Sequence, residues 1–190
     1  MILVIDNYDS FVNNLARYVR EAGRETVVYR NDAMTVDECL SLRPDGVIIS
    51  PGPKAPSESG ISMALLQALD PQTPMLGVCL GHQCLVEVFG GETRRAAHPL
   101  HGEASELHHH GRGLFAGVPS PTMAARYHSL VSDPAPGAPL RSVAWSADGE
   151  LMAVAHELRP WFGVQFHPES LLSPYGRRIV QNFLSFCGRR

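Results

Sequence analysis

The sequence lacks the features that point to a membrane or to a nucleic acid. No apolar run approaches the roughly 20 residues that a helix needs to span a bilayer. Neither sign of charge dominates, because 16 basic and 19 acidic residues leave a formal net charge of -3. Proteins that bind nucleic acid or an anionic membrane surface usually carry an excess of basic residues. We therefore expect no nucleic acid and no membrane among the partners.

Cysteine is also scarce, and nothing at the start of the chain resembles an export signal. The segment from Met1 to Asp6 is apolar up to its final carboxylate, with no basic stretch and no cleavage site. Cysteines without an export signal are typical of reduced thiols in a cytosol, not of a disulfide framework. We therefore expect a cytoplasmic protein with four reduced cysteines, namely Cys39, Cys79, Cys84 and Cys187.

The length and the apolar content are those of an ordinary globular domain. With 190 residues, 44% of them hydrophobic and 18% charged, the chain can bury a full core. We expect one domain over residues 1–190. In the first half, apolar runs alternate with amphipathic segments, which is typical of a parallel sheet covered by helices on both faces. The strands predicted in this half cover residues 2–6, 26–30, 46–50 and 75–79, and a further strand is predicted over residues 162–166.

Several predicted helices carry start and stop signals. Ser10 is placed to cap a helix that Gly23 ends. Thr35 and Glu38 form a capping box before a short helix that ends near Leu42. Further helices are predicted over residues 61–69, 81–89 and 175–187.

The second half of the chain has a different pattern. Between residues 92 and 166, short strand-like runs are separated by turn signals rich in proline and glycine, which indicates antiparallel hairpins. The predicted fold class is therefore α/β, with an open, mostly parallel sheet flanked by helices and an appended antiparallel β section.

The most informative residue is Cys79, which stands between Gly77 and Gly81 where a predicted strand meets a predicted helix. A nucleophile at such a corner is held in a tight turn that only small neighbours allow. The backbone N–H groups that open the next helix then point at whatever the sulfur attacks. A buried structural cysteine is the alternative, and the flanking glycines favour the nucleophile.

His167 and Glu169 supply a candidate base and a carboxylate to orient it. His167 follows a predicted strand, and open parallel sheets carry their active sites at such strand ends. Pro168 fixes the backbone between the two residues, which share a face if the segment is extended. A thiol, an imidazole and a carboxylate together suit acyl transfer through a thioester. Cys79, His167 and Glu169 are therefore the predicted catalytic groups.

Two backbone N–H groups are candidates for an oxyanion hole. Pro51 and Pro53 stiffen the loop around Gly52 and leave its N–H as the free donor there. This loop follows a strand next to that of Cys79, so the Gly52 N–H and the Leu80 N–H can meet beside the sulfur. An ordinary turn is the alternative at Gly52.

A group of histidines invites a metal site. It consists of His98, His101 and the run from His108 to His110. Consecutive residues of a strand point to opposite faces, and no cysteine or carboxylate pattern completes a ligand set. We therefore expect a solvated cluster and no metal site.

Taken together, these residues resemble those of the class I (triad) glutamine amidotransferases, and the resemblance covers nearly the whole chain. Within that family the chain is similar to the small subunits of aminodeoxychorismate synthase and anthranilate synthase. Lys54 and Ala55 depart from the family pattern of a small or uncharged residue followed by Thr, and Glu103 stands where a lysine is common. The matching stretches are residues 5–11 (IDNYDSF), 50–53 (SPGP), 77–83 (GVCLGHQ), 126–130 (RYHSL) and 165–170 (QFHPES).

The resemblance implies that L-glutamine is the substrate. Cys79 would attack the side-chain amide, His167 would protonate the departing ammonia, and Glu169 would hold the imidazole. Gly52 and Leu80 would supply the oxyanion N–H groups. The residues that would bind the glutamine are Gly52, Gln83, Ser129 and Leu130.

The resemblance also implies a partner, because this family passes ammonia through a tunnel to a larger synthase subunit that binds chorismate and Mg2+. This chain would then need no cofactor of its own. Aminodeoxychorismate synthase, of folate biosynthesis, is the preferred partner, and anthranilate synthase, of tryptophan biosynthesis, or a dual-use subunit is the alternative. Two other classes of function stay open. One is a stand-alone γ-glutamyl thiol hydrolase, and the other is a partner-binding module whose triad is idle.

Overall fold

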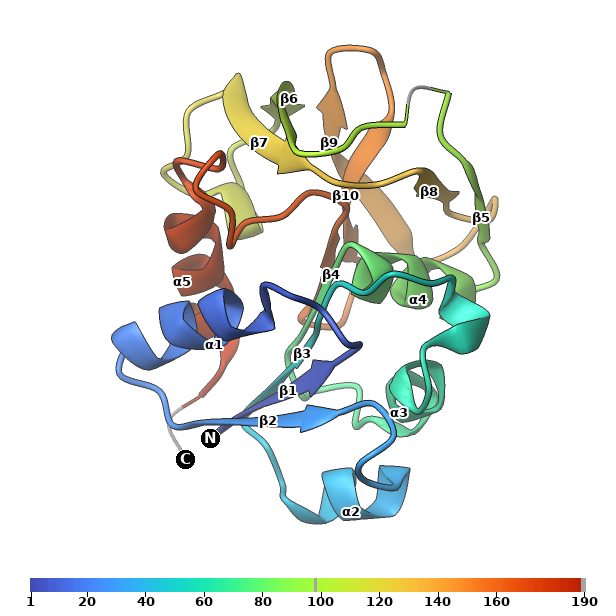
Figure 1. Cartoon of the computed structure of the whole chain (residues 1–190), viewed down its shortest axis with the longest axis vertical. Helices are drawn as coiled ribbons and strands as arrows, with labels where there is room; N and C mark the ends of the chain where they lie inside the picture. Colours follow the sequence, from blue (N-terminus) through green and yellow to red (C-terminus); the bar gives the residue numbers. More distant parts are fainter. Residues whose placement is uncertain (98, 189–190) are drawn as a thin grey trace.

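One nine-stranded sheet runs through the molecule, and its first part is parallel (Figure 1). The computed structural model describes residues 1–97 and 99–188. The parallel part has the strand order β2-β1-β3-β4-β11, in which each neighbouring pair is parallel. These strands are β1 (Ile2–Asp6), β2 (Thr26–Arg30), β3 (Gly46–Ile49), β4 (Met75–Val78) and β11 (Trp161–Val164).

The antiparallel strands of the second half continue the same sheet beyond β11, in the order β10-β9-β6-β7. A separate two-stranded sheet pairs two further short segments. The predicted antiparallel section is therefore present, and most of it extends the parallel core. Its strands are β6 (Glu103–His109), β7 (Thr122–Arg126), β9 (Leu140–Ser146) and β10 (Leu151–His156), and the small sheet holds β5 (Glu92–Arg95) and β8 (Leu130–Asp133).

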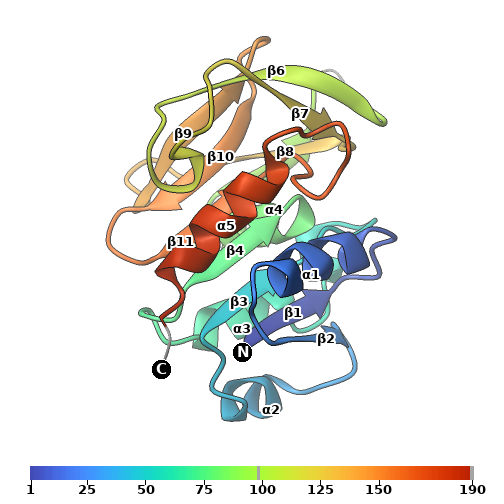
Figure 2. The ribbon, with the colours of Figure 1, turned by 90° about the vertical axis from the view of Figure 1, so that its left-hand side faces the viewer.

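Helices cover both faces of the parallel strands, as Figure 2 shows for α1 and α5 on the near side. The alternation along β1 divides its side chains between two cores. Ile2 and Val4 pack in a cluster with residues of α1 and α5, whereas Leu3 and Ile5 pack with residues of α3 and α4. The helices are α1 (Val12–Glu21), α2 (Val36–Ser41), α3 (Ser62–Ala68), α4 (Leu80–Val88) and α5 (Gly176–Phe186), with single 3-10 turns at Pro56–Glu58 and Gly113–Phe115.

The predicted element ends are mostly within two residues of those observed, and one predicted cap is wrong. Thr35 and Glu38 form the expected capping box. Ser10, however, does not cap α1, which begins at Val12 after Phe11 without a side-chain cap. The Asp9 carboxylate accepts a hydrogen bond from the Phe11 N–H at 3.0 Å instead. The turn before the helix therefore uses the carboxylate one residue earlier.

Among residues 1–97 and 99–188, no helix combines the length and apolar character that crossing a bilayer requires.

The corner between β4 and α4 depends on two glycines that lie against backbone. A Cβ atom on Gly77 would stand 2.3 Å from the carbonyl oxygen of Gly81. A Cβ atom on Gly81 would stand 2.3 Å from the carbonyl oxygen of Ile49 in β3. Real Cβ atoms do not approach so closely, and backbone cannot move aside as a flexible side chain can. These glycines therefore allow α4 to start directly against the sheet.

We expect Gly77→Ala to lower the free energy of unfolding by about 3 kcal/mol, because its methyl group displaces the first turn of α4. Urea unfolding followed by circular dichroism measures this change. Gly188→Ala is the matched control, since a Cβ atom there meets nothing within 4 Å. The control should change stability by less than about 0.5 kcal/mol. Equal stability of both variants would contradict this account, because it would show that the corner accommodates a methyl group on Gly77.

Candidate active site

Cys79 occupies the corner between β4 and α4 in a strained backbone conformation. Its φ is 50° and its ψ is -101°, and it precedes the first helical residue, Leu80. A residue with a side chain rarely adopts a positive φ, and such strain costs about 1–3 kcal/mol. The corner is fixed from outside by a hydrogen bond of 2.8 Å from the Cys79 N–H to the carbonyl oxygen of Val164 in β11. Strain maintained in this way is typical of functional positions.

His167 and Glu169 lie on the segment that follows β11. The Nδ1 atom of His167 is 2.5 Å from Oε1 of Glu169, and both side chains are buried. The segment is attached to β7 by a hydrogen bond of 2.9 Å from the His167 N–H to the carbonyl oxygen of Ala125. Ser173 adds a second attachment, because its hydroxyl donates to the His167 carbonyl oxygen and accepts from the Ala125 N–H. The imidazole therefore has a fixed orientation, with Nδ1 facing Glu169.

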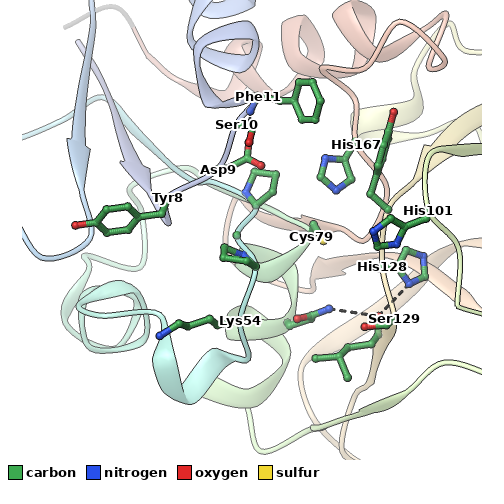
Figure 3. A pocket seen from close by; sticks show the side chains of 16 residues that line it. Tyr8, Asp9, Ser10, Phe11, Lys54, Cys79, His101, His128, Ser129 and His167 are labelled. Carbon is green, nitrogen blue, oxygen red and sulfur yellow. Dashed lines mark hydrogen bonds between the residues drawn. The ribbon is translucent and has the colours of Figure 1, made fainter.

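The free nitrogen of His167 faces the sulfur. Within the described part of the chain, Nε2 of His167 has no hydrogen-bond partner. Its ring and the Cys79 thiol are turned toward the same pocket (Figure 3). Burial lowers the pKa of His167, but the nearby Cys79 and the hydrogen-bonded Glu169 outweigh burial and hold the pKa well above 6.5. The site thus favours the protonated form of the His167 imidazole.

The pocket beside Cys79 has a volume of about 340 Å³ and brings most of the predicted site residues together. Leu80 and Glu169 do not line it, since Glu169 lies behind the His167 ring and Leu80 turns its side chain into a neighbouring pocket. The predicted residues in its lining are Gly52, Cys79, Gln83, Ser129, Leu130 and His167.

The two predicted oxyanion donors are free to act on a ligand. Leu80 is the first residue of α4, and the first N–H groups of a helix have no partner inside it. Neither the Gly52 N–H nor the Leu80 N–H donates a hydrogen bond to another residue of ranges 1–97 and 99–188. The Gly52 loop follows β3, which pairs with β4. Two backbone donors from adjacent strand ends therefore flank the corner of Cys79.

Gln83 and Leu130 meet at the far wall of the pocket. The Nε2 atom of Gln83 donates to the Leu130 carbonyl oxygen at 3.3 Å, and it also donates to Oε1 of Gln165 at 3.2 Å. Gln83 is buried at 3% exposure. The polar wall is thus built from α4, β8 and the segment after β11.

Some residues of this region were not predicted as site residues. Asp9 and Tyr127 line the pocket, and Tyr127 meets the His167 ring edge-on with ring centroids 5.1 Å apart. Gln165 donates to the sulfur of Cys79 at 3.5 Å. His82 is fully buried beneath the site. All four belong to the stretches that carry the family resemblance, but nothing in their local pattern distinguishes a site residue from a packed one.

The described members of the histidine group do not form a metal site. No cluster of three or more His, Cys, Asp or Glu side chains suited to a metal occurs among the residues that the structure describes. His109 stacks on Phe115 and His110 meets Trp145 edge-on. His98 lies outside the described residues.

The departures from the family pattern lie on different segments of the fold. Lys54 is an exposed residue of the pocket lining and pairs with Glu58 at 3.5 Å. Glu103 begins β6, opposite Arg126 of β7. Each residue therefore has its own surroundings.

Comparison with known proteins agrees with this geometry. A family model for class I glutamine amidotransferases matches residues 3–186. The chain is 46% identical over 185 residues to aminodeoxychorismate/anthranilate synthase component 2 of Bacillus subtilis, covering 97% of this chain and 95% of the relative. It is 48% identical over 186 residues to aminodeoxychorismate synthase component 2 of Klebsiella aerogenes, covering 97% and 100%. It is 46% identical over 191 residues to anthranilate synthase component 2 of Azospirillum brasilense, covering 100% and 97%.

A solved structure shares the fold. A crystal structure assigned to one subunit of a GMP synthase from Thermoplasma acidophilum superposes with a TM-score of 0.88 at 29% sequence identity, covering 98% of this chain and 92% of that one. The strained cysteine corner, the buried histidine–glutamate pair and a family match over almost the whole length agree with one another. The chain therefore belongs to the class I glutamine amidotransferase family.

Proposed function

We propose that this chain is the glutaminase subunit of a chorismate-aminating synthase, with Cys79 as the nucleophile. The observation that carries the proposal is the shared pocket of the Cys79 thiol and the His167 ring, with Glu169 bonded to the far side of that ring. Such an arrangement suits the activation of a thiol by an oriented base. The names of the relatives support the assignment to an aminating synthase.

The reaction begins when the Cys79 thiolate attacks the side-chain carbonyl carbon of glutamine. The carbonyl oxygen becomes an oxyanion, which the N–H groups of Gly52 and Leu80 stabilise. His167 gives its Nε2 proton to the departing nitrogen, so ammonia leaves and a glutamyl thioester remains. His167 then takes a proton from water, the hydroxide attacks the thioester, and glutamate and the thiolate are released. Glu169 keeps the imidazole in the orientation that both proton transfers require.

The same pocket accounts for the binding of glutamine. Both donor hydrogens of the Gln83 Nε2 atom are already used, on Leu130 and Gln165. Only the side-chain carbonyl oxygen of Gln83 is therefore left to contact the ligand, and it accepts a hydrogen bond from the α-ammonium group of glutamine. Ser129 is exposed at the rim beside Leu130 and contributes a hydroxyl. A zwitterionic amino acid with an uncharged side-chain amide suits such a mixed wall.

Ammonia produced here serves a larger subunit that binds chorismate. Aminodeoxychorismate synthase is the proposed partner, because the Klebsiella aerogenes relative that bears this name is matched along its whole length. Anthranilate synthase is the alternative, and the name of the Bacillus subtilis relative joins both activities. Mixing the chain with each candidate synthase, chorismate and glutamine separates these outcomes, since only the true partner yields its aminated product. High glutaminase turnover without either synthase would indicate a stand-alone hydrolase.

We expect Cys79→Ser to lower glutamine-dependent product formation in the reconstituted complex by at least about 10³-fold, because the thiolate is lost. Product formation from ammonium chloride should persist, since free ammonia bypasses the glutaminase. Chromatographic measurement of the aminated product with each nitrogen source tests both statements. Loss of both activities would mean that the complex is broken. Retention of both would mean that the chain serves only as a binding module.

Asp9 places another carboxylate in the same pocket as the catalytic groups. Burial is the main cause that raises its pKa from 3.8 to about 6, and the nearby charge of Glu169 adds to it. The unfolded chain gives up this proton near pH 4, whereas the folded chain holds it until about pH 6. The Asp9 charge therefore reduces stability as the pH rises through this window, and the full penalty applies above it.

We expect Asp9→Asn to raise the melting temperature at pH 8 by about 2–4 °C, a shift limited by the solvent that reaches this half-buried group. The gain should nearly vanish near pH 3.5, where the Asp9 carboxyl is neutral in the folded chain and mostly neutral in the unfolded chain. Differential scanning calorimetry at both values measures it. Asp70→Asn is the matched control, since exposed Asp70 also accepts from the N–H two residues ahead. A gain that is the same at both pH values would contradict the proposed charge penalty.

A further inference from the structure

We propose that the side-chain amide of Gln165 is a further catalytic group, which donates a hydrogen bond to the sulfur of Cys79 and stabilises its thiolate. The inference rests on the proposed function, because it assumes that Cys79 is the nucleophile. The Nε2 atom of Gln165 lies 3.5 Å from Sγ, and the Gln165 side chain is fully buried. Its backbone is held by a bond of 2.8 Å from its N–H to the carbonyl oxygen of Met152 in β10.

The direction of the Gln165 amide is determined by its neighbours. Its Oε1 atom lies 3.2 Å from Nε2 of Gln83, which also lies 3.3 Å from the carbonyl oxygen of Leu130. A backbone carbonyl oxygen can only accept, so the Gln83 atom that faces it is the NH2 group. The same NH2 group must then meet the oxygen of Gln165. The NH2 group of Gln165 is thereby left facing the sulfur.

The Leu130 carbonyl is itself held from the other side. The Nδ1 atom of His128 lies 3.0 Å from it, and Nε2 of His128 lies 3.1 Å from Nε of Arg126. An arginine can only donate, so Nε2 of His128 accepts and Nδ1 donates to Leu130. Burial, with the Arg126 charge, lowers the pKa of His128 to about 4, which keeps this tautomer neutral. Glu150 pairs with Arg126, which is itself buried.

These bonds connect Arg126 to the sulfur, and the Leu130 carbonyl oxygen in the middle accepts from both His128 and Gln83. Each of these groups has one permitted donor or acceptor role, so the Gln165 amide cannot turn over without breaking the bond to Gln83. A hydrogen bond to a charged group is stronger than one to its neutral form. The Gln165 bond therefore favours the thiolate over the thiol. The same hydrogen bond stabilises the thiolate when it leaves as water attacks the thioester.

Gln165→Met tests the proposal, because methionine keeps an unbranched side chain of similar volume and removes the donor. The measurement is the rate of Cys79 alkylation by iodoacetamide as a function of pH, read by mass spectrometry. We expect the rate at pH 7 to fall about tenfold and the pH midpoint to rise by about one unit. Met152→Leu is the matched control, since it alters packing beside Gln165 and leaves the amide in place. The control should keep the midpoint of the unmodified chain.

A second variant keeps the proposal testable if Gln165→Met does not fold. Gln165→Glu retains an acceptor for Gln83 and presents an oxygen to the sulfur, so it should slow alkylation at pH 8 at least as much as Gln165→Met. A wild-type midpoint in either folded variant would overturn the role of Gln165. In the unsubstituted chain, the side-chain NH2 resonances of Gln165 should shift when Cys79 is alkylated, and unchanged resonances would overturn it as well.

The proposed function is judged by a different result. If Cys79→Ser retained glutamine-dependent synthesis, Cys79 would not be the nucleophile, whatever the midpoints of the Gln165 variants. If Cys79→Ser lost that synthesis and the Gln165 variants kept the wild-type midpoint, only the role of Gln165 would be rejected.

Discussion

The close approach of α4 to the parallel sheet is the constraint on which the site depends. Gly77 and Gly81 have no side chains, so the first turn of α4 can lie directly on the backbone of β3 and β4. The chain must then reverse within one residue, and Cys79 takes the strained conformation that results. The core on both sides of the sheet stabilises this strain, since one residue's cost of a few kcal/mol is small beside the burial of that core. The proposed nucleophile keeps this conformation because the packing leaves it no relaxed alternative.

The rest of the site is brought to this corner by the sheet. β11 pairs with β4 in parallel, so the segment after β11 emerges beside Cys79 although it lies far along the chain. There His167 is attached to β7, and Glu169 fixes the ring from behind. The antiparallel strands thus do more than extend the sheet. They supply the wall that holds His167 on one side and carries the Leu130 carbonyl on the other.

Much of this arrangement could be predicted from sequence because the signals are local. The apolar runs predicted the parallel strands, and the glycines around Cys79 predicted its corner. The predicted cap of α1 was wrong, because the helix begins after Phe11 without a side-chain cap, and the turn before it is held by the Asp9 carboxylate. Gln165 was missed, since its role depends on Gln83 and Leu130, which come from distant segments. Contacts of that kind have no signature in the order of residues.

The most direct measurement is covalent labelling of the reconstituted complex with the glutamine analogue 6-diazo-5-oxo-L-norleucine, followed by digestion and mass spectrometry. The pocket geometry predicts one adduct, on Cys79, which excess glutamine prevents. Cys39, Cys84 and Cys187 should stay unmodified because they are buried away from the pocket. An adduct on another residue, or continued glutamine-dependent synthesis with no adduct on Cys79, would contradict the assignment of this thiol as the nucleophile.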